Sequence, residues 1–202
     1  MTKGVARERM RLAPGEVLLY PGVPSPNEPV YRVVRGLVRI QHVDPDGSSL
    51  TLRFVRPGQF FGEEALIGVE RDYFAEAMTE TEVEAIDREE LEKGLYPELI
   101  ASLVSALDES YTRLEHLANK RLKNRIAATL LELAGTDLAE AGEEGPVLRL
   151  THDDLAAAVG SVRETVTKVV GELAREGLIR LGYGKLTLID QKGLTRLAKS
   201  RE

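Results

Sequence analysis

Four side chains with complementary hydrogen-bonding chemistry lie close together near the C-terminal end of the sequence: Arg163, Glu164, Thr167 and Lys168. An arginine can donate two parallel hydrogen bonds to O6 and N7 of a guanine, and a glutamate can accept one from N4 of a cytosine. A lysine adds a compact positive charge that suits a second guanine. On one face of a helix, these groups can read base edges in the major groove of duplex DNA.

The residues around this set predict two short helices with a tight turn between them. Thr151, followed by Asp154 three residues later, has the pattern of a capping box at the start of the first helix. Gly160 can adopt the left-handed conformation that a tight turn requires. The apolar residues of the second helix share one face, opposite the polar set, and they are Val162, Val166, Val169, Val170 and Leu173.

Other interpretations fit the same residues. Glu164 and Lys168 are four residues apart in the order that favours a surface ion pair, and any amphipathic helical hairpin would share the apolar face. The segment that follows favours DNA binding, because Leu178–Leu181 and Lys185–Ile189 predict two short strands around a turn at Gly182–Gly184. Helix, turn, helix and β-hairpin in this order predict a winged helix-turn-helix.

Several polar residues of this region are candidates for contacts to DNA phosphates, which set the position of a protein on the duplex without reading its sequence. They are Thr151, His152, Ser161, Thr165 and Thr167. The charge distribution supports the same location. The chain has a net charge of −6, but residues 161–201 contain nine basic and four acidic side chains. A basic surface therefore coincides with the predicted reading helix.

These motifs resemble the cyclic AMP receptor protein/FNR family of bacterial transcription regulators. The matching residues are Val159-Gly160-Ser161, Arg163 to Val166, Lys168, and the Leu-x-x-x-Gly-Leu-Ile run from Leu173 to Ile179. The resemblance implies double-stranded DNA as a partner and a half-site similar to TGTGA. The family has arginine at the positions of Lys168 and His152, and serine at that of Val162. We expect an activator, with a repressor of the same family as the alternative.

The segment from Gly15 to about Asp87 has the pattern of short strands separated by turns. Pro21-Gly22, Asp44–Gly47 and Pro57-Gly58 are turn sequences that separate short runs rich in apolar and β-branched residues. Strands this short and regular predict an antiparallel β-roll.

This half also resembles the cyclic-nucleotide-binding domain of the family, through Arg35-Gly36-x-Val38, Arg56-Pro57-Gly58 and Phe61-Gly62-Glu63. The resemblance implies an effector pocket at Gly62, Glu63, Arg71, Asp72, Ser110 and Tyr111. Asp72 argues against cyclic AMP, because an ionised carboxylate repels a phosphate and can instead pair with Arg71 or its neighbours. Tyr111 is a bulky ring where the receptors have a small residue. We therefore expect no cofactor and a roll that serves as a scaffold. Gating by cyclic AMP or another small effector is the alternative.

Residues 97–120 predict one long helix between the two halves. Its apolar residues follow a 4-3-4-3-4 spacing: Ile100, Val104, Leu107, Tyr111, Leu114 and Ala118. This spacing is typical of a coiled coil, although a helix that packs only on its own domain is also amphipathic. With the family position, it predicts a parallel homodimer on a near-palindromic operator. The acidic loop Ala139–Pro146 matches a family loop that can contact RNA polymerase, and plain solvent exposure is the alternative.

Composition excludes several other classes of protein. The chain has no cysteine, so disulfides, thiolate metal sites and cysteine-ligated iron–sulfur clusters are excluded. His42, His116 and His152 fall in three different segments, which argues against a cupin-like metalloenzyme with clustered histidine ligands. There is no apolar run long enough to span a membrane. We expect a cytoplasmic protein that is not an enzyme, holds no metal and does not bind membranes.

The sequence thus predicts an α+β chain in three parts. These are a cyclic-nucleotide-binding-like antiparallel β-roll over residues 1–96, a dimerisation helix over residues 97–120, and a winged helix-turn-helix over residues 121–202.

Overall fold

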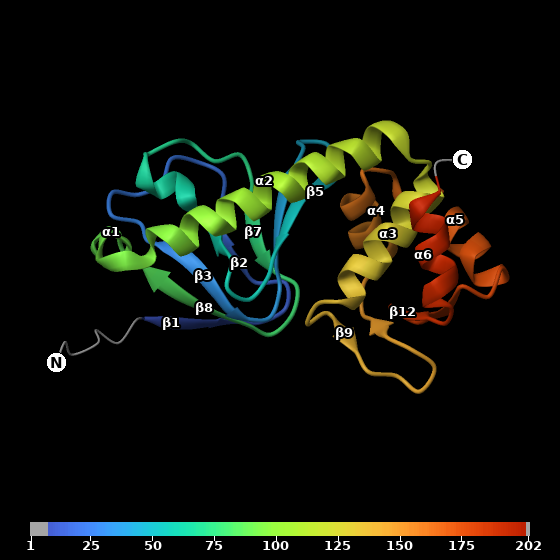
Figure 1. The fold of residues 1–202 in the computed structure, drawn as a ribbon. Coiled ribbons are helices and arrows are strands. Elements are labelled where there is room, and N and C mark those ends of the chain that lie inside the picture. Colours follow the sequence, from blue (N-terminus) through green and yellow to red (C-terminus); the bar gives the residue numbers. More distant parts are fainter. Residues whose placement is uncertain (1–7, 201–202) are drawn as a thin grey trace. The chain divides into compact units, whose positions relative to one another are not determined.

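The computed structural model describes residues 8–200, and these residues form two compact units. The first contains the chain up to His42 together with Arg53–Glu109, and the second contains Val43–Leu52 together with the chain from Ser110 onward. The long helix α2 (Tyr96–Asn119) contributes its first half to one unit and its second half to the other (Figure 1).

Two four-stranded sheets form the predicted β-roll. One has the order β1 (Arg9–Leu12), β8 (Thr81–Ile86), β3 (Val30–Arg35) and β6 (Phe60–Phe61). The other has the order β2 (Val17–Leu19), β7 (Phe74–Ala77), β4 (Val38–Val43) and β5 (Ser49–Val55). The pairs β1–β8, β8–β3, β3–β6, β2–β7 and β7–β4 all run antiparallel, which confirms the predicted antiparallel roll.

Alternation along β3 shows how the sequence forms this roll. Tyr31 and Val33 belong to the core between the sheets, whereas Val30 packs on the other side of the strand. The chain reverses between β3 and β4 at Gly36, whose φ is 90°. A Cβ atom there would lie 2.5 Å from Oγ1 of Thr81, so glycine is required for both its conformation and its size.

Three short helical segments lie around the roll and before α2: η1 (Glu63–Leu66), α1 (Arg88–Glu90) and η2 (Leu91–Leu95). The Asp87 carboxylate accepts a hydrogen bond from the Glu90 N–H and so caps α1. The first half of α2 then packs on the roll through Leu99 and Ser102, both of which are buried. The Ser102 hydroxyl accepts a hydrogen bond of 2.9 Å from the Phe60 N–H, which fixes α2 against β6.

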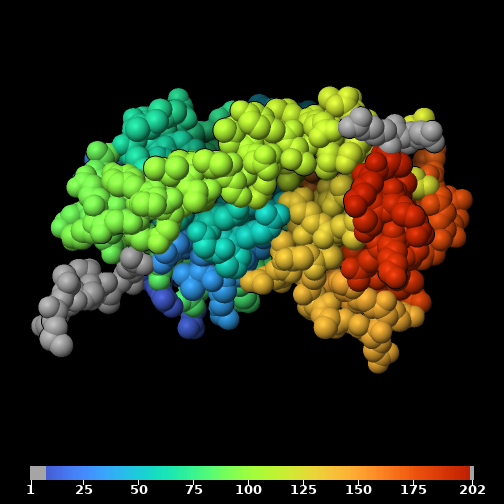
Figure 2. Space-filling model, in the orientation of Figure 1, coloured from blue at the N-terminus to red at the C-terminus, as the bar shows by residue number. Residues whose placement is uncertain are grey.

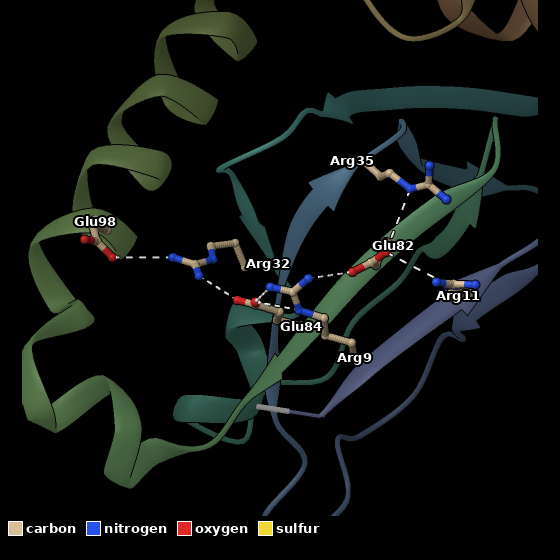
Figure 3. Close-up of polar contacts among 7 residues, drawn as sticks. All are labelled: Arg9, Arg11, Arg32, Arg35, Glu82, Glu84 and Glu98. Atoms are coloured by element: carbon tan, nitrogen blue, oxygen red, sulfur yellow. Dashed lines mark hydrogen bonds and ion pairs between the residues drawn. The ribbon is translucent and has the colours of Figure 1, made fainter. Parts of the chain in front are cut away.

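Charged residues cover the outer face of the first sheet (Figure 3). Glu84 lies between Arg9 and Arg32, at 3.0 and 2.5 Å, and its side chain is 6% exposed. Glu82, on the same strand, contacts Arg9 at 2.9 Å. Arg11, Arg35 and Glu98 complete the network. Alternating charges therefore cover the part of this sheet face around Arg32 and Glu84, beside the buried apolar cluster of Val30, Phe60 and Ile86.

The second unit contains the helices α3 (Leu122–Ala134), α4 (His152–Val159), α5 (Arg163–Arg175) and α6 (Gln191–Lys199). Its sheet has the order β11 (Ile179–Gly182), β12 (Lys185–Leu188), β10 (Val147–Leu148) and β9 (Ala139–Glu140). Helix α6, which the sequence pattern did not predict, packs beside α3 (Figure 2). Buried Asn124 of α3 donates 2.8 Å hydrogen bonds to the carbonyl and hydroxyl oxygens of Ser200, just after α6.

The acidic segment Ala139–Pro146 differs in part from its prediction as a loop. Its first two residues form β9, which pairs antiparallel with β10. Ion pairs hold this hairpin: Arg149 contacts Glu140 at 2.6 Å, and Arg180 of β11 binds Glu144. Strand pairing and these ion pairs order a segment whose composition alone indicated a solvated loop.

Candidate nucleic-acid interface

The helix-turn-helix begins with the predicted capping box on α4. The Thr151 hydroxyl accepts a hydrogen bond of 3.0 Å from the Asp154 N–H, and the Asp154 carboxylate accepts one of 2.9 Å from the Thr151 N–H. The Thr151 hydroxyl also donates to the same carboxylate at 2.7 Å. Gly160 ends α4 in the left-handed conformation, with φ of 62°, as the sequence predicted.

Helix α5 has the two faces that the sequence indicated. Val166, Val170 and Leu173 are completely buried, whereas Arg163, Glu164 and Lys168 are all exposed. The three candidate base-reading residues therefore lie on the solvent side of the helix, in its first two turns.

Val162 was wrongly assigned to the buried face of α5. It precedes the helix as its N-cap, in an extended conformation, and is 61% exposed. The helix begins only at Arg163, so the helical spacing that linked Val162 to the other valines does not apply to it. Val169, in contrast, is partly buried along with the stripe.

Residues at the start of α4 contact those at the start of α5. Asp153 forms an ion pair of 3.0 Å with Arg163, and both side chains are largely exposed. His152 Nδ1 lies 2.8 Å from the Thr167 hydroxyl. Among the described residues, no ion pair joins Glu164 to Lys168, which was the alternative interpretation of their spacing. The two helices thus hold Arg163 and Thr167 in place and leave Glu164 and Lys168 exposed.

The remaining candidate phosphate contacts lie in and beside the turn. Thr165 is exposed, and Ser161 is partly exposed. The Ser161 backbone N–H donates to the Ala156 carbonyl at 3.1 Å, which closes the turn. The Thr151 hydroxyl, by contrast, is already engaged in the capping box.

The predicted wing follows α5 directly. Strands β11 and β12 pair from Ile179 with Leu188 to Gly182 with Lys185, as expected for a two-stranded hairpin. Tyr183 at its tip is fully exposed. Helix, turn, helix and hairpin are therefore present in the predicted order.

Helix α2 carries an exposed apolar stripe at the predicted heptad positions. Its large members are Ile100, Val104, Leu107, Tyr111 and Leu114, which are between 51% and 62% exposed. Ala118, the last position of the predicted pattern, is also exposed. In Figure 2, α2 is uncovered along the surface. Such a continuous row of exposed large apolar side chains on one helix is typical of a surface that another chain covers.

The predicted effector arginine, Arg71, is buried in the roll and bound by a carboxylate of the same chain. Its side chain is 4% exposed, and its Nη2 lies 2.5 Å from the Glu28 carboxylate. Its Nε is buried and has no hydrogen-bond partner among the described residues. Burial, and then the charge of Glu28, raise the pKa of the neighbouring Tyr31 hydroxyl. Glu28 was missed by the sequence analysis, because it lies in a proline-rich loop distant in sequence from Arg71.

Other polar groups of this region are paired in the same way. Glu63, which follows Gly62 at the start of η1, binds Arg53 at 2.7 Å. The Tyr73 hydroxyl donates to Glu64 at 2.6 Å, and burial followed by this hydrogen bond raises the pKa of Tyr73. The expected pairing of Asp72 with Arg71 is wrong. The Asp72 side chain is 85% exposed and lies 3.3 Å from His42 Nδ1, because the chain alternation turns it outward while Arg71 points inward.

The other two predicted pocket residues belong to the second unit. Ser110 is partly buried, and Tyr111 is 61% exposed. Within residues 8–200 there is no group of three or more histidines and carboxylates arranged to hold a metal ion. In the same range, no helix has the length and apolar character needed to cross a membrane.

Two family models match the chain in the two regions just described. The model of the cyclic nucleotide-binding domain matches residues 9–95, and the model of the Crp-like helix-turn-helix domain matches residues 124–197. Together they cover the roll and the winged helix-turn-helix, with α2 between them.

Similar proteins agree over almost the full length. The transcriptional regulator SdrP of Thermus thermophilus is 58% identical over 195 residues, which cover 96% of each chain. The cyclic AMP receptor protein of Thermus thermophilus is 34% identical, over 93% of this chain and 87% of that protein. A crystal structure of a CRP/FNR-family transcriptional regulator from Thermus thermophilus has a TM-score of 0.90 at 57% identity, covering 96% of this chain and all of the other.

These matches identify a regulator rather than an enzyme, and they place the exposed polar face of α5 within a helix-turn-helix domain. The chain belongs to the CRP/FNR family of transcription regulators, with a cyclic-nucleotide-binding-type roll and a helix-turn-helix DNA-binding domain.

Proposed function

We propose that this chain activates transcription as a homodimer that binds near-palindromic DNA with TGTGA-like half-sites and does not require cyclic AMP. The observation that carries the proposal is the exposed set Arg163, Glu164 and Lys168 at the start of α5, opposite a fully buried apolar face. In this proposal, residues 97–120 form the dimerisation part between the roll and the DNA-binding part.

Base reading follows from the chemistry of the three exposed groups. Arg163 spans O6 and N7 of one guanine, Glu164 accepts from the amino group of a cytosine, and Lys168 contacts a second guanine. The ion pair of Arg163 with Asp153 supports this assignment, because it holds the guanidinium near the first turn of α5 before DNA arrives. Thr151, His152, Ser161, Thr165 and Thr167 contact phosphates and set the register.

The dimer is supported by the stripe on α2. Five large apolar side chains, each more than half exposed, lie at coiled-coil spacing along one helix. A second copy of α2 would remove them from water and place two helix-turn-helix motifs on two-fold related half-sites.

Independence from cyclic AMP is supported by the Glu28–Arg71 pair. A buried arginine that binds a cyclic phosphate must be free to receive an anion. Here the Glu28 carboxylate of the same chain already lies 2.5 Å from the guanidinium. A nucleotide would have to displace this partly buried carboxylate, which would then repel the phosphate.

One observation favours a ligand-gated regulator as the second candidate. The Nε of Arg71 is buried without a hydrogen-bond partner among the described residues, and an anionic effector could accept from it. The match to the cyclic nucleotide-binding domain supports the same alternative.

Activation rather than repression is supported by the acidic segment Ala139–Pro146. Its acidic side chains are exposed, while Arg149 and Arg180 hold it to the rest of the unit, so it offers an ordered surface to RNA polymerase. Transcription in vitro from a promoter bearing the operator, with purified polymerase, tests this assignment. Reduced transcript in the presence of the protein would assign repression.

A binding competition tests the DNA proposal. A labelled TGTGA palindrome is bound by the purified chain and competed with unlabelled palindromes in which one G·C pair of each half-site is exchanged for A·T. We expect each base-pair exchange to weaken the binding free energy of the competitor by about 1–3 kcal/mol for each base contact that it removes. Equal competition by all palindromes would show that α5 does not read these bases.

A further inference from the structure

We propose that Arg113 and Arg125 are positioning residues that fix the end of α4 to the dimerisation helix and so set the half-site spacing that the dimer accepts. This inference rests on the proposed function, and it assigns a role to two side chains outside the set proposed to contact DNA.

The end of α4 leaves carbonyl groups that need partners. The N–H groups of Gly160 and Ser161 both donate to the Ala156 carbonyl, so the turn itself satisfies only that oxygen. The carbonyls of Ala158 and Val159 belong to buried residues, 5% and 3% exposed, and receive no hydrogen bond from the turn. Buried carbonyls without donors are costly, and the end of a helix carries partial negative charge.

Two guanidinium groups supply the missing donors. Arg113 Nη1 donates to the Ala158 carbonyl at 3.1 Å, and Arg125 Nε donates to the Val159 carbonyl at 3.1 Å. Hydrogen bonds from a charged donor are stronger than those between neutral groups. Adjacent carbonyls at the start of the turn are therefore held by two separate helices.

The two arginines lie on opposite sides of the junction between α2 and α3. Arg113 is on α2, and it also donates to the Thr51 carbonyl at 3.4 Å and lies 3.8 Å from Glu132. Arg125 is on α3, and its Nη1 donates to the Lys120 carbonyl at 3.0 Å, at the junction itself. Burial lowers the pKa of Arg125, but an arginine stays charged at neutral pH. The turn is thus linked to both helices that meet at the junction.

The packing of Gly160 adds a steric contact to the same link. A Cβ atom on Gly160 would lie 3.0 Å from Cδ2 of Leu117, so the turn lies directly against α2. The position also has positive φ, which disfavours any larger residue. Helix α5 begins three residues later, at Arg163, and its direction relative to α2 follows from this attachment.

In the proposed dimer, α2 defines the two-fold axis, and α5 must enter successive major grooves on one side of the DNA. A firm link from α2 to the turn allows one distance between the two α5 helices. A loosened link allows several distances. The two arginines therefore affect spacing preference more than recognition of each half-site.

The first test measures affinity for a series of TGTGA palindromes whose half-sites are moved apart by one or two base pairs, using wild type, Arg113→Met and Arg113→Lys. We expect the wild-type preference for its best spacing to fall roughly tenfold in Arg113→Met, which corresponds to about one lost hydrogen bond to a charged donor. Arg113→Lys keeps the charge and one donor direction, so we expect it to restore part of that preference.

Arg121→Met is the matched control, because Arg121 lies at the same junction and its side chain is exposed. We expect it to keep the wild-type preference. An unchanged spacing preference in Arg113→Met would overturn the proposal. So would an equal loss of affinity at every spacing, because that result assigns Arg113 a general role in stability.

A second test needs no DNA and separates this inference from the proposed function. Hydrogen exchange of the turn amides of Gly160 and Ser161 is compared between wild type and Arg113→Met, with the amides of α6 as the internal reference. We expect roughly tenfold faster exchange in the turn alone. Unchanged exchange in the turn contradicts the inference. A wild type that binds none of the palindromes contradicts the proposed function instead, and leaves this test valid.

Discussion

Arg163 and Glu164 adjoin in sequence but have different surroundings. Arg163 is held by Asp153 at 3.0 Å, whereas Glu164 is exposed without an ion-pair partner among the described residues. On binding a guanine, Arg163 must exchange Asp153 for the base, so Asp153 both positions the guanidinium and competes with DNA for it. Both side chains of this ion pair are more than half exposed, so we expect the competition to be weak.

The first prediction concerns base discrimination. Arg163→Ala and Glu164→Ala each remove one base contact. The wild type should bind the TGTGA palindrome more tightly than a palindrome in which the contacted base pair is replaced. In each variant this difference in binding free energy should shrink by about 1–3 kcal/mol. Binding titrations by fluorescence anisotropy measure this difference. Lys192→Ala is the control for loss of a basic charge, because Lys192 is an exposed residue of α6. It should leave the affinity difference between the two palindromes unchanged. If Lys192→Ala shrank this affinity difference equally, the effect would come from the overall charge of the protein and not from a lost base contact.

Glu28 is the residue that sequence reasoning could least foresee. A pattern along the chain identifies residues that share a helix face or a strand face, and Arg163, Glu164 and Lys168 were predicted in that way. The Glu28–Arg71 pair joins a loop to a distant segment, and a backbone bridge between Gly22 and Arg71 joins the same two segments. Asp72, beside the arginine in sequence, was the more obvious partner, but it is exposed and contacts His42.

Among the elements, α2 has three sides with different contacts. One side packs on the roll at Leu99 and Ser102, another holds the turn at Arg113, and a third bears the exposed apolar stripe. A helix that packs only on its own domain would bury its apolar residues there. The stripe of α2 instead remains uncovered in the single chain.

The second prediction tests this stripe. Leu107 is 51% exposed at a coiled-coil position. In a parallel dimer, Leu107→Glu would place one negative charge from each chain at the same level of the interface, where the two charges repel each other. We expect the variant to sediment as a monomer and to lose affinity for the palindrome. Thr112→Glu introduces the same charge at an exposed position off the stripe and should remain dimeric. Wild type that sediments as a monomer, or a dimeric Leu107→Glu, contradicts the proposed interface.

The third prediction concerns pH and the end of α2. Burial, and then the charge of Lys120, lower the pKa of His116, while Glu115 opposes the shift. His116 Nε2 lies 2.7 Å from Lys120 Nζ, so the folded chain favours the neutral ring as an acceptor. A lowered pKa in the folded state gives stability that is present above the ordinary value of about 6.5 and is lost as pH falls.

We therefore expect the unfolding temperature of wild type to fall more than that of His116→Gln when the pH is lowered from about 8 to about 5.5. Thermal unfolding by circular dichroism at each pH measures the two differences. Carboxylates titrate in both proteins, so the difference between the two pH dependences gives the contribution of His116. Identical pH dependence in the two proteins would mean that His116 does not favour its neutral form in the folded state.

Elements differed in how far the sequence predicted them. The strands of the roll from β2 onward, α2, the helix-turn-helix and the wing have clear periodicity and turn residues, and all of them are present. Strand β1 lies before Gly15, where the predicted strand pattern begins, and was missed. Helix α6 was missed because its apolar positions, such as Leu194 and Ala198, are few and are separated by charged residues. Strand β9 was missed because pairing with β10 and ion pairs order it, and neither effect is visible in its own composition.

The fourth prediction concerns the charge network on the outer face of the first sheet. Glu84 is nearly buried between Arg9 and Arg32, so Glu84→Gln keeps the shape and removes the charge that both arginines bind (Figure 3). We expect a loss of about 1–3 kcal/mol in unfolding free energy, measured by denaturant titration. Arg11→Gln is the control, because Arg11 is 81% exposed and 4.0 Å from Glu82, and should have little effect. If Glu84→Gln were as stable as wild type, the charge of Glu84 would make no net contribution to the free energy of unfolding.

At the scale of the whole molecule, charge is divided between the two ends of the chain. The net charge is −6, yet residues 161–201 contain nine basic and four acidic side chains. The basic end attracts the DNA backbone, while the acidic remainder limits binding by other surfaces. Affinity will therefore depend on salt, and comparisons between variants require one fixed ionic strength.

We propose that this chain binds its operator without a nucleotide, because the Glu28 carboxylate already pairs with the Arg71 guanidinium in the roll. The most direct test titrates a labelled TGTGA palindrome with the purified chain at one fixed salt concentration, with and without cyclic AMP, and follows fluorescence anisotropy. We expect tight binding, with the same Kd in both conditions. Binding that occurs only when cyclic AMP is added would contradict it, and would make the roll a working nucleotide sensor.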